Sequence, residues 1–184
     1  MPPVVHSFAP VAAADARVLV LGSMPGLKSL QAGQYYAHPR NLFWAFMGEL
    51  VGADPVLPYP ERCKRLSDSG IAVWDVLSFC ERPGSLDSSI RNDTAQANDF
   101  AEFFARHPGI GLVLFNGAKA ESSFMKLAAI TLPPGVDTLR LPSTSPANAS
   151  QRPRDKLEAW RSGLRRAGIS VADPTLAAAA GVTT

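Results

Sequence analysis

Four short apolar runs constrain the fold of this chain more than any other feature. The first, at 17–22 (RVLVLG), is apolar at consecutive positions rather than at alternate ones. Such runs, roughly four to eight residues long, are typical of strands buried on both faces of a parallel sheet. We interpret the segments 71–77, 111–115 and 136–141 in the same way. The sequence therefore predicts four strands of a mainly parallel sheet.

Helical periodicity fills the intervals between these runs. We expect helices at about 41–51, 60–69, 95–106 and 118–129, and a closing helix at 155–167. In the closing helix, apolar residues recur at three- and four-residue spacings, and the other face is basic. Strands that alternate with helices predict crossover connections. We therefore predict an α/β fold, a three-layer α/β/α sandwich with a central, mainly parallel four-stranded sheet.

Length and composition indicate one domain. The chain has 184 residues, of which 46% are hydrophobic, and we place a single domain at 1–170. Residues 171–184 carry little apolar variety and one charge, so we expect a partly ordered tail there. The apolar runs are far shorter than the roughly 20 residues that cross a bilayer. We therefore expect a cytoplasmic protein with no membrane partner.

Charge and cysteine content argue against several kinds of site. Eighteen basic and sixteen acidic residues give a net charge of +2, so any affinity for a polyanion depends on where the charges lie. Cys63 and Cys80 are isolated from each other and from any histidine cluster. This spacing predicts no disulfide framework, zinc site or iron–sulfur site, and we expect no metal and no cofactor.

The loop after the first predicted strand is rich in small residues. Its sequence is Gly22-Ser23-Met24-Pro25-Gly26, which lets the backbone approach a ligand closely, although the same pattern also makes an ordinary turn. Ligands of parallel sheets bind at the carboxyl ends of the strands, where this loop would lie. The loop has neither the Gly-Lys-Ser/Thr of a Walker motif nor the spacing of a serine nucleophile elbow.

The segment 35–44 (YYAHPRNLFW) combines aromatic rings with hydrogen-bonding groups. An exposed Tyr36 ring is suited to stack on a planar heterocycle, and Asn41 is suited to cap the following helix or to hold a water molecule. We interpret His38 as a structural hydrogen-bonding residue. After the third strand, the amide of Asn116 is suited to pair with the carbonyl and ring N–H of a lactam-type base, or to cap the next helix.

The loop after the last predicted strand is stiff. Pro142 and Pro146 enclose small hydroxyl residues that are able to contact phosphates through side chains and backbone amides. A loop of this kind can act as a wedge. Basic residues follow it on the closing helix, beginning with Arg152 and Arg154, although a charged helix face is usually only solvated.

These motifs together resemble the uracil-DNA glycosylase superfamily, in particular its hypoxanthine-DNA glycosylase branch, over roughly residues 17–168. The segment 22–26 matches the first motif of the superfamily, and 143–146 takes the place of its second, DNA-inserting motif. The segment 36–44 resembles the mismatch-specific uracil and thymine glycosylases. The segments most similar to the hypoxanthine branch are 70–77, 84–88 and 116–117.

Two positions depart from the pattern of the superfamily. Met24 stands where mismatch-specific members carry Asn, and the major uracil enzymes Asp, as the residue that positions water. A thioether cannot do so. The resemblance makes Asn41 the first catalytic candidate for that role and Asp75 the second. Ser143 stands where many uracil enzymes have a histidine that stabilises the departing base.

The resemblance implies a monofunctional DNA N-glycosylase. Such an enzyme flips a deaminated base out of DNA and hydrolyses its bond to the sugar, leaving an abasic site. Hypoxanthine is the favoured base and uracil the alternative. The implied partner is double-stranded DNA, with single-stranded DNA as an alternative, and we expect a monomer that associates with the nucleoid. The implied base-binding residues are Ser23, Met24, Pro25, Gly26, Tyr36 and Asn116, and the implied DNA-binding residues are Ser143, Thr144, Ser145, Pro146, Ala147, Arg152 and Arg154.

Two other functions stay open at this point. A non-catalytic protein that binds damaged DNA on the same scaffold would explain why Met24 and Ser143 replace catalytic groups. A small-molecule hydrolase would use Ser23 or Ser143 as nucleophile and His38 as base. The spacing shows no acidic residue that would orient that histidine.

Overall fold

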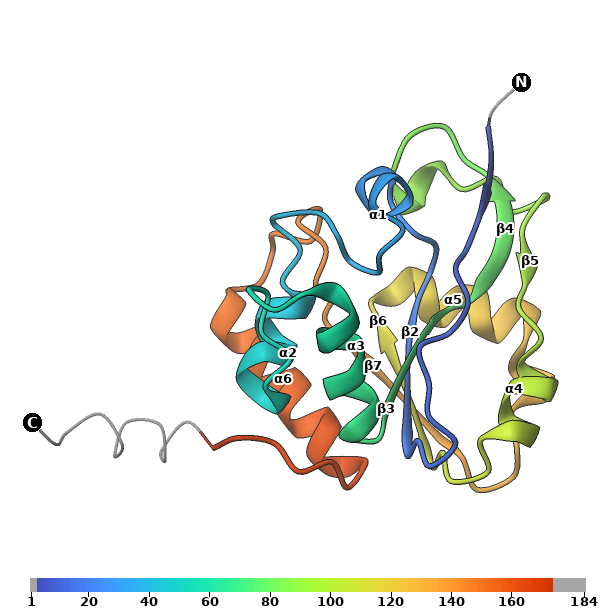
Figure 1. Cartoon of the computed structure of the whole chain (residues 1–184). Coiled ribbons are helices and arrows are strands. Elements are labelled where there is room, and N and C mark those ends of the chain that lie inside the picture. Colours follow the sequence, from blue (N-terminus) through green and yellow to red (C-terminus); the bar gives the residue numbers. More distant parts are fainter. Residues whose placement is uncertain (1–2, 174–184) are drawn as a thin grey trace, which may run out of the picture.

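A parallel sheet forms the centre of the protein (Figure 1), whose computed structural model describes residues 3–173. The sheet consists of strands β2 (Val18–Gly22), β3 (Ile71–Asp75), β6 (Leu112–Asn116) and β7 (Asp137–Leu141). They are all parallel, in the order β3-β2-β6-β7. Strands β2 and β3 are buried along their whole length, which explains why their apolar residues are consecutive. The predicted four-stranded sheet is confirmed.

Helices cover both faces of this sheet, so the predicted three-layer α/β/α arrangement is confirmed (Figure 1). On one face lie α2 (Phe43–Val51), α3 (Tyr59–Asp68) and α6 (Pro153–Arg166). On the other face lie α4 (Phe100–Arg106) and α5 (Ala118–Leu127).

Aromatic side chains fill the two interfaces between sheet and helices. The rings of Phe43 in α2 and Trp160 in α6 meet edge to face, with 6.0 Å between their centroids. On the opposite face, Phe100 of α4 lies 5.1 Å from Trp74 of β3 and 5.1 Å from Phe124 of α5. All five of these rings are at most 8% exposed, so both faces of the sheet contribute to the hydrophobic core.

A second, antiparallel sheet was not expected. It pairs β4 (Leu77–Glu81) with two short strands, β1 (Val4–His6) and β5 (Gln96–Ala97). The predicted strand 71–77 is therefore wrong in its extent, because β3 ends at Asp75 and β4 begins at Leu77. The helix predicted at 95–106 begins at Phe100, since the side chain of Asp99 accepts a hydrogen bond from the Glu102 amide at 3.0 Å.

Three short helices also went unpredicted. They are α1 (Leu27–Ala32) and the two 3-10 turns η1 (Asp87–Ser89) and η2 (Ala129–Thr131). Of the predicted tail at 171–184, only 171–173 falls within the described residues, and there the Ala172 amide donates to the Leu50 carbonyl at 2.9 Å. No helix in the described part of the chain is long and apolar enough to cross a membrane.

Candidate active site

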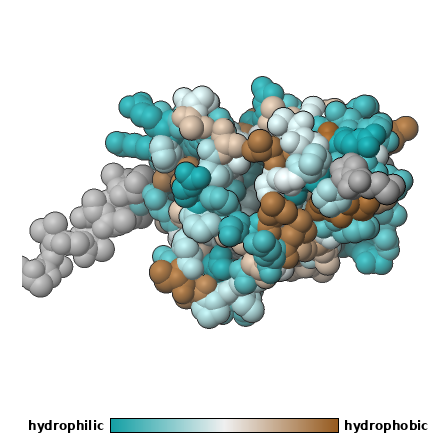
Figure 2. All heavy atoms as spheres, turned by 90° about the horizontal axis from the view of Figure 1, so that it is seen from above, coloured by the Kyte–Doolittle hydropathy of each residue, from teal (hydrophilic) through white to brown (hydrophobic). Residues whose placement is uncertain are grey.

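The carboxyl ends of the four parallel strands lie along one edge of the sheet, and a cavity of about 620 Å³ opens there. Figure 2 looks down on this edge, where the surface is hollowed between mixed hydrophilic and hydrophobic lobes. Most of the lining comes from four segments that are distant in sequence, 22–29, 35–41, 85–87 and 143–148. Loops that follow different strands therefore build a single site.

The structure brings nearly all of the predicted site residues to this cavity. Those that line it are Ser23, Met24, Pro25, Gly26, Tyr36, Asn41, Asp75, Asn116, Ser143, Thr144, Ser145, Pro146 and Ala147. Arg152 and Arg154 do not line it, because they stand at the start of α6. Arg152 is 85% exposed and forms an ion pair with Asp155, with 2.9 Å between Nε and Oδ2.

Asp75 lies at the deep end of the cavity, opposite Gly22 in the pairing of β3 with β2. A Cβ atom at Gly22 would stand 2.5 Å from Asp75 Oδ1 and 3.0 Å from the Tyr36 hydroxyl, so only glycine leaves room for both groups. Asp75 is 3% exposed, and its Oδ2 has no hydrogen-bond partner among the described residues. Burial and the nearby Asp87 raise the pKa of Asp75 from 3.8 to about 7, although Arg82 acts against them.

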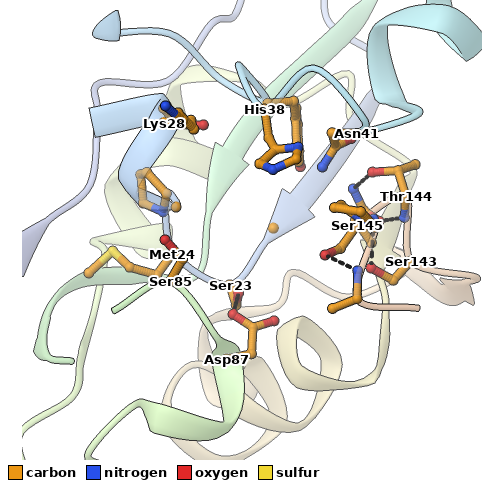
Figure 3. A pocket seen from close by; sticks show the side chains of 18 of the residues that line it. Ser23, Met24, Lys28, His38, Asn41, Ser85, Asp87, Ser143, Thr144 and Ser145 are labelled. Atoms are coloured by element: carbon orange, nitrogen blue, oxygen red, sulfur yellow. Dashed lines mark hydrogen bonds between the residues drawn. The ribbon is translucent and has the colours of Figure 1, made fainter. Parts of the chain in front are cut away.

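Asn41 lies at the other side of the cavity from Met24 (Figure 3). Its Oδ1 accepts a hydrogen bond from the Phe43 amide at 2.9 Å, which fixes the side chain at the start of α2. Its amide nitrogen is turned toward the cavity (Figure 3). The interpretation of Asn41 as a helix cap is wrong, because the N-cap position of α2 is Leu42 and no side chain caps it, but one end of the Asn41 amide is held by the Phe43 amide while the other faces the site.

Tyr36 presents only one ring face to a ligand. Its other face is stacked on Phe43, with 4.1 Å between centroids and an interplanar angle of 30°. The residue has a φ of 53°, in the left-handed region, which costs about 1–3 kcal/mol for a non-glycine residue and is found at functional sites. The Tyr36 hydroxyl is buried without a hydrogen-bond partner among the described residues, and burial together with Asp75 raises its pKa.

Asn116 is bound to the loop that follows β7. Its Nδ2 donates to the Thr144 hydroxyl and its Oδ1 accepts from the Thr144 amide, each at 2.9 Å. One lone pair of the amide stays available for a ligand, and the amide also lies close to the Tyr36 hydroxyl, where it opposes the rise in the pKa of that phenol. The interpretation of Asn116 as a helix cap is wrong, because the N-cap position of α5 is Gly117 and no side chain caps it.

Thr144 fastens the 143–148 loop to two other elements of the site. It is fully buried, and besides its two bonds to Asn116 its carbonyl accepts from the Leu42 amide at 3.0 Å. Ser143 faces the same cavity, and its hydroxyl accepts from the Ser145 amide at 3.2 Å. The start of α2 and the end of β6 thus hold one loop between them (Figure 3).

Lys156 holds the 143–148 loop in place through hydrogen bonds that the sequence did not predict. Its Nζ donates to the Ser143 carbonyl at 2.9 Å and to the Asn148 carbonyl. Lys156 is 2% exposed, and burial lowers its pKa. The interpretation of the basic residues of this helix as a solvated face is therefore wrong for Lys156, and also for Arg161, which is 2% exposed and paired with Glu49.

A buried polar cluster that the sequence did not single out closes the side of the cavity near Ser23. The Ser23 hydroxyl donates to Asp87 Oδ1 at 2.6 Å. Arg82 is fully buried and donates to the carbonyls of Pro25 and Gly84. Burial raises the pKa of Asp87, and the hydrogen bond from Ser23 opposes that rise. The only sequence signal for this cluster was the resemblance of 84–88 to the hypoxanthine branch.

Lys28 and Arg40 also line the cavity and are exposed, so they place positive charge at its rim. His38 points into the cavity between Lys28 and Asn41 (Figure 3). Its Nδ1 accepts from the Arg40 amide at 3.1 Å, which leaves the proton on Nε2. Among the described residues no hydrogen bond joins His38 to a serine, so the geometry gives no support to a serine hydrolase.

The described part of the chain has no group of three or more His, Cys, Asp or Glu side chains arranged to hold a metal ion. Cys63 and Cys80 are both free. The side chains that line the cavity supply amides, hydroxyls, two carboxyls, an imidazole, aromatic rings and a basic rim.

An α/β/α domain with a polar and aromatic cavity at the carboxyl edge of its sheet is typical of enzymes that bind small ligands or nucleotides. Comparison with known proteins identifies the family within this class. Residues 9–164 match the sequence profile of the Uracil DNA glycosylase superfamily. A protein of Methanosarcina barkeri named hypoxanthine DNA glycosylase is 35% identical over 162 residues, which span 88% of this chain and 98% of that protein. A protein of the same name from Methanosarcina acetivorans is 34% identical over 144 residues, which span 78% and 87%.

The fold agrees with these sequence relationships. The solution NMR structure of a protein from Methanosarcina acetivorans, described as a candidate uracil DNA glycosylase, matches with a TM-score of 0.74 and 30% identity over 90% of this chain and 99% of that chain. The chain belongs to the uracil DNA glycosylase superfamily. It is a DNA glycosylase, a hydrolase that acts on N-glycosyl bonds with DNA as its substrate.

Proposed function

We propose that this DNA glycosylase removes hypoxanthine from double-stranded DNA. One observation carries the proposal: a single cavity joins a stacking ring, two amides and a buried carboxyl in a chain with two relatives named hypoxanthine DNA glycosylase. Its volume of about 620 Å³ lies within the usual range of ligand pockets and accommodates a bicyclic base. Uracil is proposed as a secondary substrate, since it presents the same edge, a carbonyl beside a ring N–H.

The flipped base would lie against the free face of Tyr36. Its polar edge would meet the Asn116 amide, together with the backbone N–H groups of Ser23, Met24 and Gly26. Flipping costs a few kcal/mol and least for a mispaired base, so selectivity begins with weak pairing. Cleavage places negative charge on the base and positive charge on the sugar, and fixed dipoles around the base therefore lower the barrier.

Asn41 would hold the attacking water beneath the anomeric carbon. A neutral amide cannot deprotonate water strongly, but it is able to fix its position, and the bond from the Phe43 amide to Oδ1 holds the side chain ready. Asn41 would thus position the water in place of residue 24, because the Met24 thioether cannot do so.

The exposed part of the 143–147 loop would enter the DNA beside the flipped nucleotide, while the buried Thr144 and Lys156 hold the loop in place. Lys28 and Arg40 at the rim, and Arg152 and Arg154 on α6, would bind phosphates, so affinity falls as salt rises. We also propose a monomer that works in the cytoplasm on the nucleoid, with single-stranded DNA as an alternative substrate.

Cleavage of defined oligonucleotides tests the proposal. Duplexes and single strands with one deoxyinosine or one deoxyuridine are incubated with the enzyme, and alkali then converts abasic sites to strand breaks. We expect faster breakage at deoxyinosine in the duplex than at deoxyuridine. Faster breakage at deoxyuridine would overturn the hypoxanthine assignment, and binding without breakage would favour the non-catalytic alternative.

Asn41→Ala tests the water-positioning role in the same assay, and a loss of roughly 100-fold in single-turnover rate is expected. Asn41→Ser is the matched control for folding, because serine is able to keep the hydrogen bond to the Phe43 amide but has no amide nitrogen. We expect the serine variant to melt like the wild type and to be as slow as the alanine variant. An unchanged rate in both variants would remove Asn41 from the mechanism.

A further inference from the structure

Asp75 is the carboxyl of the cavity that has a buried oxygen without a hydrogen-bond partner among the described residues. The residue is 3% exposed, and the oxygen is Oδ2. No basic side chain of residues 3–173 lies within 4.0 Å of its carboxyl oxygens. Because Gly22 has no side chain, Asp75 Oδ1 is able to occupy the space beside it, and the carboxyl fits there without a steric clash.

The groups around Asp75 disfavour a negative charge there. Burial and the carboxyl of Asp87, on η1 in the same cavity, both raise the pKa of Asp75, and the buried phenols of Tyr35 and Tyr36 beside it are neutral. Among residues 3–173, Arg82 is the cation that opposes this effect; its Nε and Nη2 donate to the carbonyls of Gly84 and Pro25, and its Nη1 is buried without a hydrogen-bond partner. A carboxylic acid fits these surroundings better than a carboxylate does.

We propose that Asp75 works as a neutral carboxylic acid that donates its proton to the departing base, and that it does not position the water. The inference rests on the proposed function, because it needs the base to occupy this cavity. Charge decides between the two roles. When the glycosidic bond breaks, its electron pair passes to the base, so an O–H donor at the pocket floor stabilises the leaving group, whereas a carboxylate repels it.

The step balances with water as the only co-reactant. The bond between the anomeric carbon and the base nitrogen breaks, and its electron pair stays on the base, which takes the proton of Asp75. The water held near Asn41 forms the new bond to the anomeric carbon and releases a proton. That proton restores the acid form of Asp75, so the products are the free base and an abasic sugar.

If Asp75 acts as the acid, the rate of cleavage falls as Asp75 ionises. Burial and Asp87 put its pKa at about 7, so the competent form is lost in mildly alkaline solution. Asn in place of Asp75 offers an N–H donor of similar size that cannot ionise. The cleavage rate of Asp75→Asn should therefore not fall as the pH rises above 7.

The experiment measures single-turnover rates with saturating enzyme on the deoxyinosine duplex between pH 5.5 and 9. The proteins are the wild type, Asp75→Asn, Asp75→Ala and Asp68→Asn. The last is the matched control, because Asp68 is an exposed carboxyl of α3. We expect the ratio of the Asp75→Asn rate to the wild-type rate to rise about tenfold per pH unit above pH 7. Asp75→Ala, without a donor, should stay roughly 100-fold slower than Asp75→Asn.

A ratio that is constant or falls with pH overturns the proposal, since a residue that holds or deprotonates water would be needed in its ionised form. Should Asp75→Asn fail to fold, the wild-type profile decides: a decline above pH 7 that Asp68→Asn shares supports the acid role, and a rising or flat profile overturns it. A wild type that cleaves only deoxyuridine refutes the hypoxanthine assignment, and the same ratio is then read on that duplex. A wild type inactive on both removes the proposed function and this inference with it.

Discussion

The buried carboxyl of Asp75 should cost the protein stability, and Asp75→Asn measures that cost without reference to catalysis. Asn has nearly the same shape but no ionisable group. Because the site opposes ionisation, the pKa of Asp75 is raised from 3.8 to about 7. Between these two values the folded protein holds a proton that the unfolded chain has already released.

The sign and size of the effect follow from this difference. Stability falls with rising pH wherever the folded state binds more protons, so the wild type loses stability from about pH 4 to about pH 7 and no further above it. The window spans about three pH units at about 1.36 kcal/mol each, which gives up to about 4 kcal/mol. Asp75→Asn should not lose stability in this way, because asparagine does not ionise.

Urea denaturation at pH 4, 5.5, 7 and 8.5 is the assay. We expect the difference in unfolding free energy between Asp75→Asn and the wild type to grow from near its pH 4 value by up to about 4 kcal/mol at pH 7, and then to level off. Asp68→Asn should show no such growth, because Asp68 is 60% exposed. A difference that stays constant from pH 4 to pH 8.5 would refute the reasoning, since it would mean that Asp75 ionises as readily in the fold as in the unfolded chain.

Three further outcomes follow from the contacts of the site. Gly22→Ala places a Cβ 2.5 Å from the neighbouring carboxyl, so we expect a loss of at least roughly 100-fold in single-turnover rate, while Gly111→Ala, with open space around it, leaves the rate unchanged. Lys156→Met removes two hydrogen bonds from the 143–148 loop, which we propose to enter the DNA, and should raise the Kd for duplex DNA roughly tenfold in binding titrations, with a smaller effect on the rate of the saturated enzyme. Arg40→Ala should reduce the slope of log K against log salt by about 0.9, and Arg106→Ala, on α4 and away from the cavity, should not change it.

The parallel sheet could be predicted because its central strands are buried on both faces, and burial of that kind leaves a continuous apolar run in the sequence. The strands of the second sheet leave no such trace. β1 and β5 have three and two residues, and their pairing with β4 depends on contacts between segments that are distant in the chain. Local pattern therefore predicted the layers but missed the elements that are held only by tertiary contacts.

The loops of the site could also be predicted, since glycine, proline and small polar residues at strand ends mark places where the chain approaches a ligand. Their internal bonds could not. Asn116 and Thr144 are joined by two hydrogen bonds across 28 residues of sequence, and Lys156 reaches back 13 residues to the Ser143 carbonyl. A basic residue on an amphipathic helix looks solvated in the sequence, and only the fold shows that this one is buried under the loop.

The two carboxyls of the cavity illustrate why residue type alone does not assign a role. Asp87 accepts the Ser23 hydroxyl at 2.6 Å, which favours its charged form, whereas Asp75 has an orphan oxygen and Asp87 as a neighbour. Where two carboxyls share a site, the one with donors ionises first and its charge then holds the proton on the other. In the proposed mechanism, the charge of Asp87 would therefore help to keep the proton on Asp75 where the base departs, although Arg82 of the same cluster acts against it. The same arrangement would favour Asn41 over a second carboxylate for the proposed role of holding the water, because a neutral amide adds no further negative charge to a site whose leaving group becomes negative.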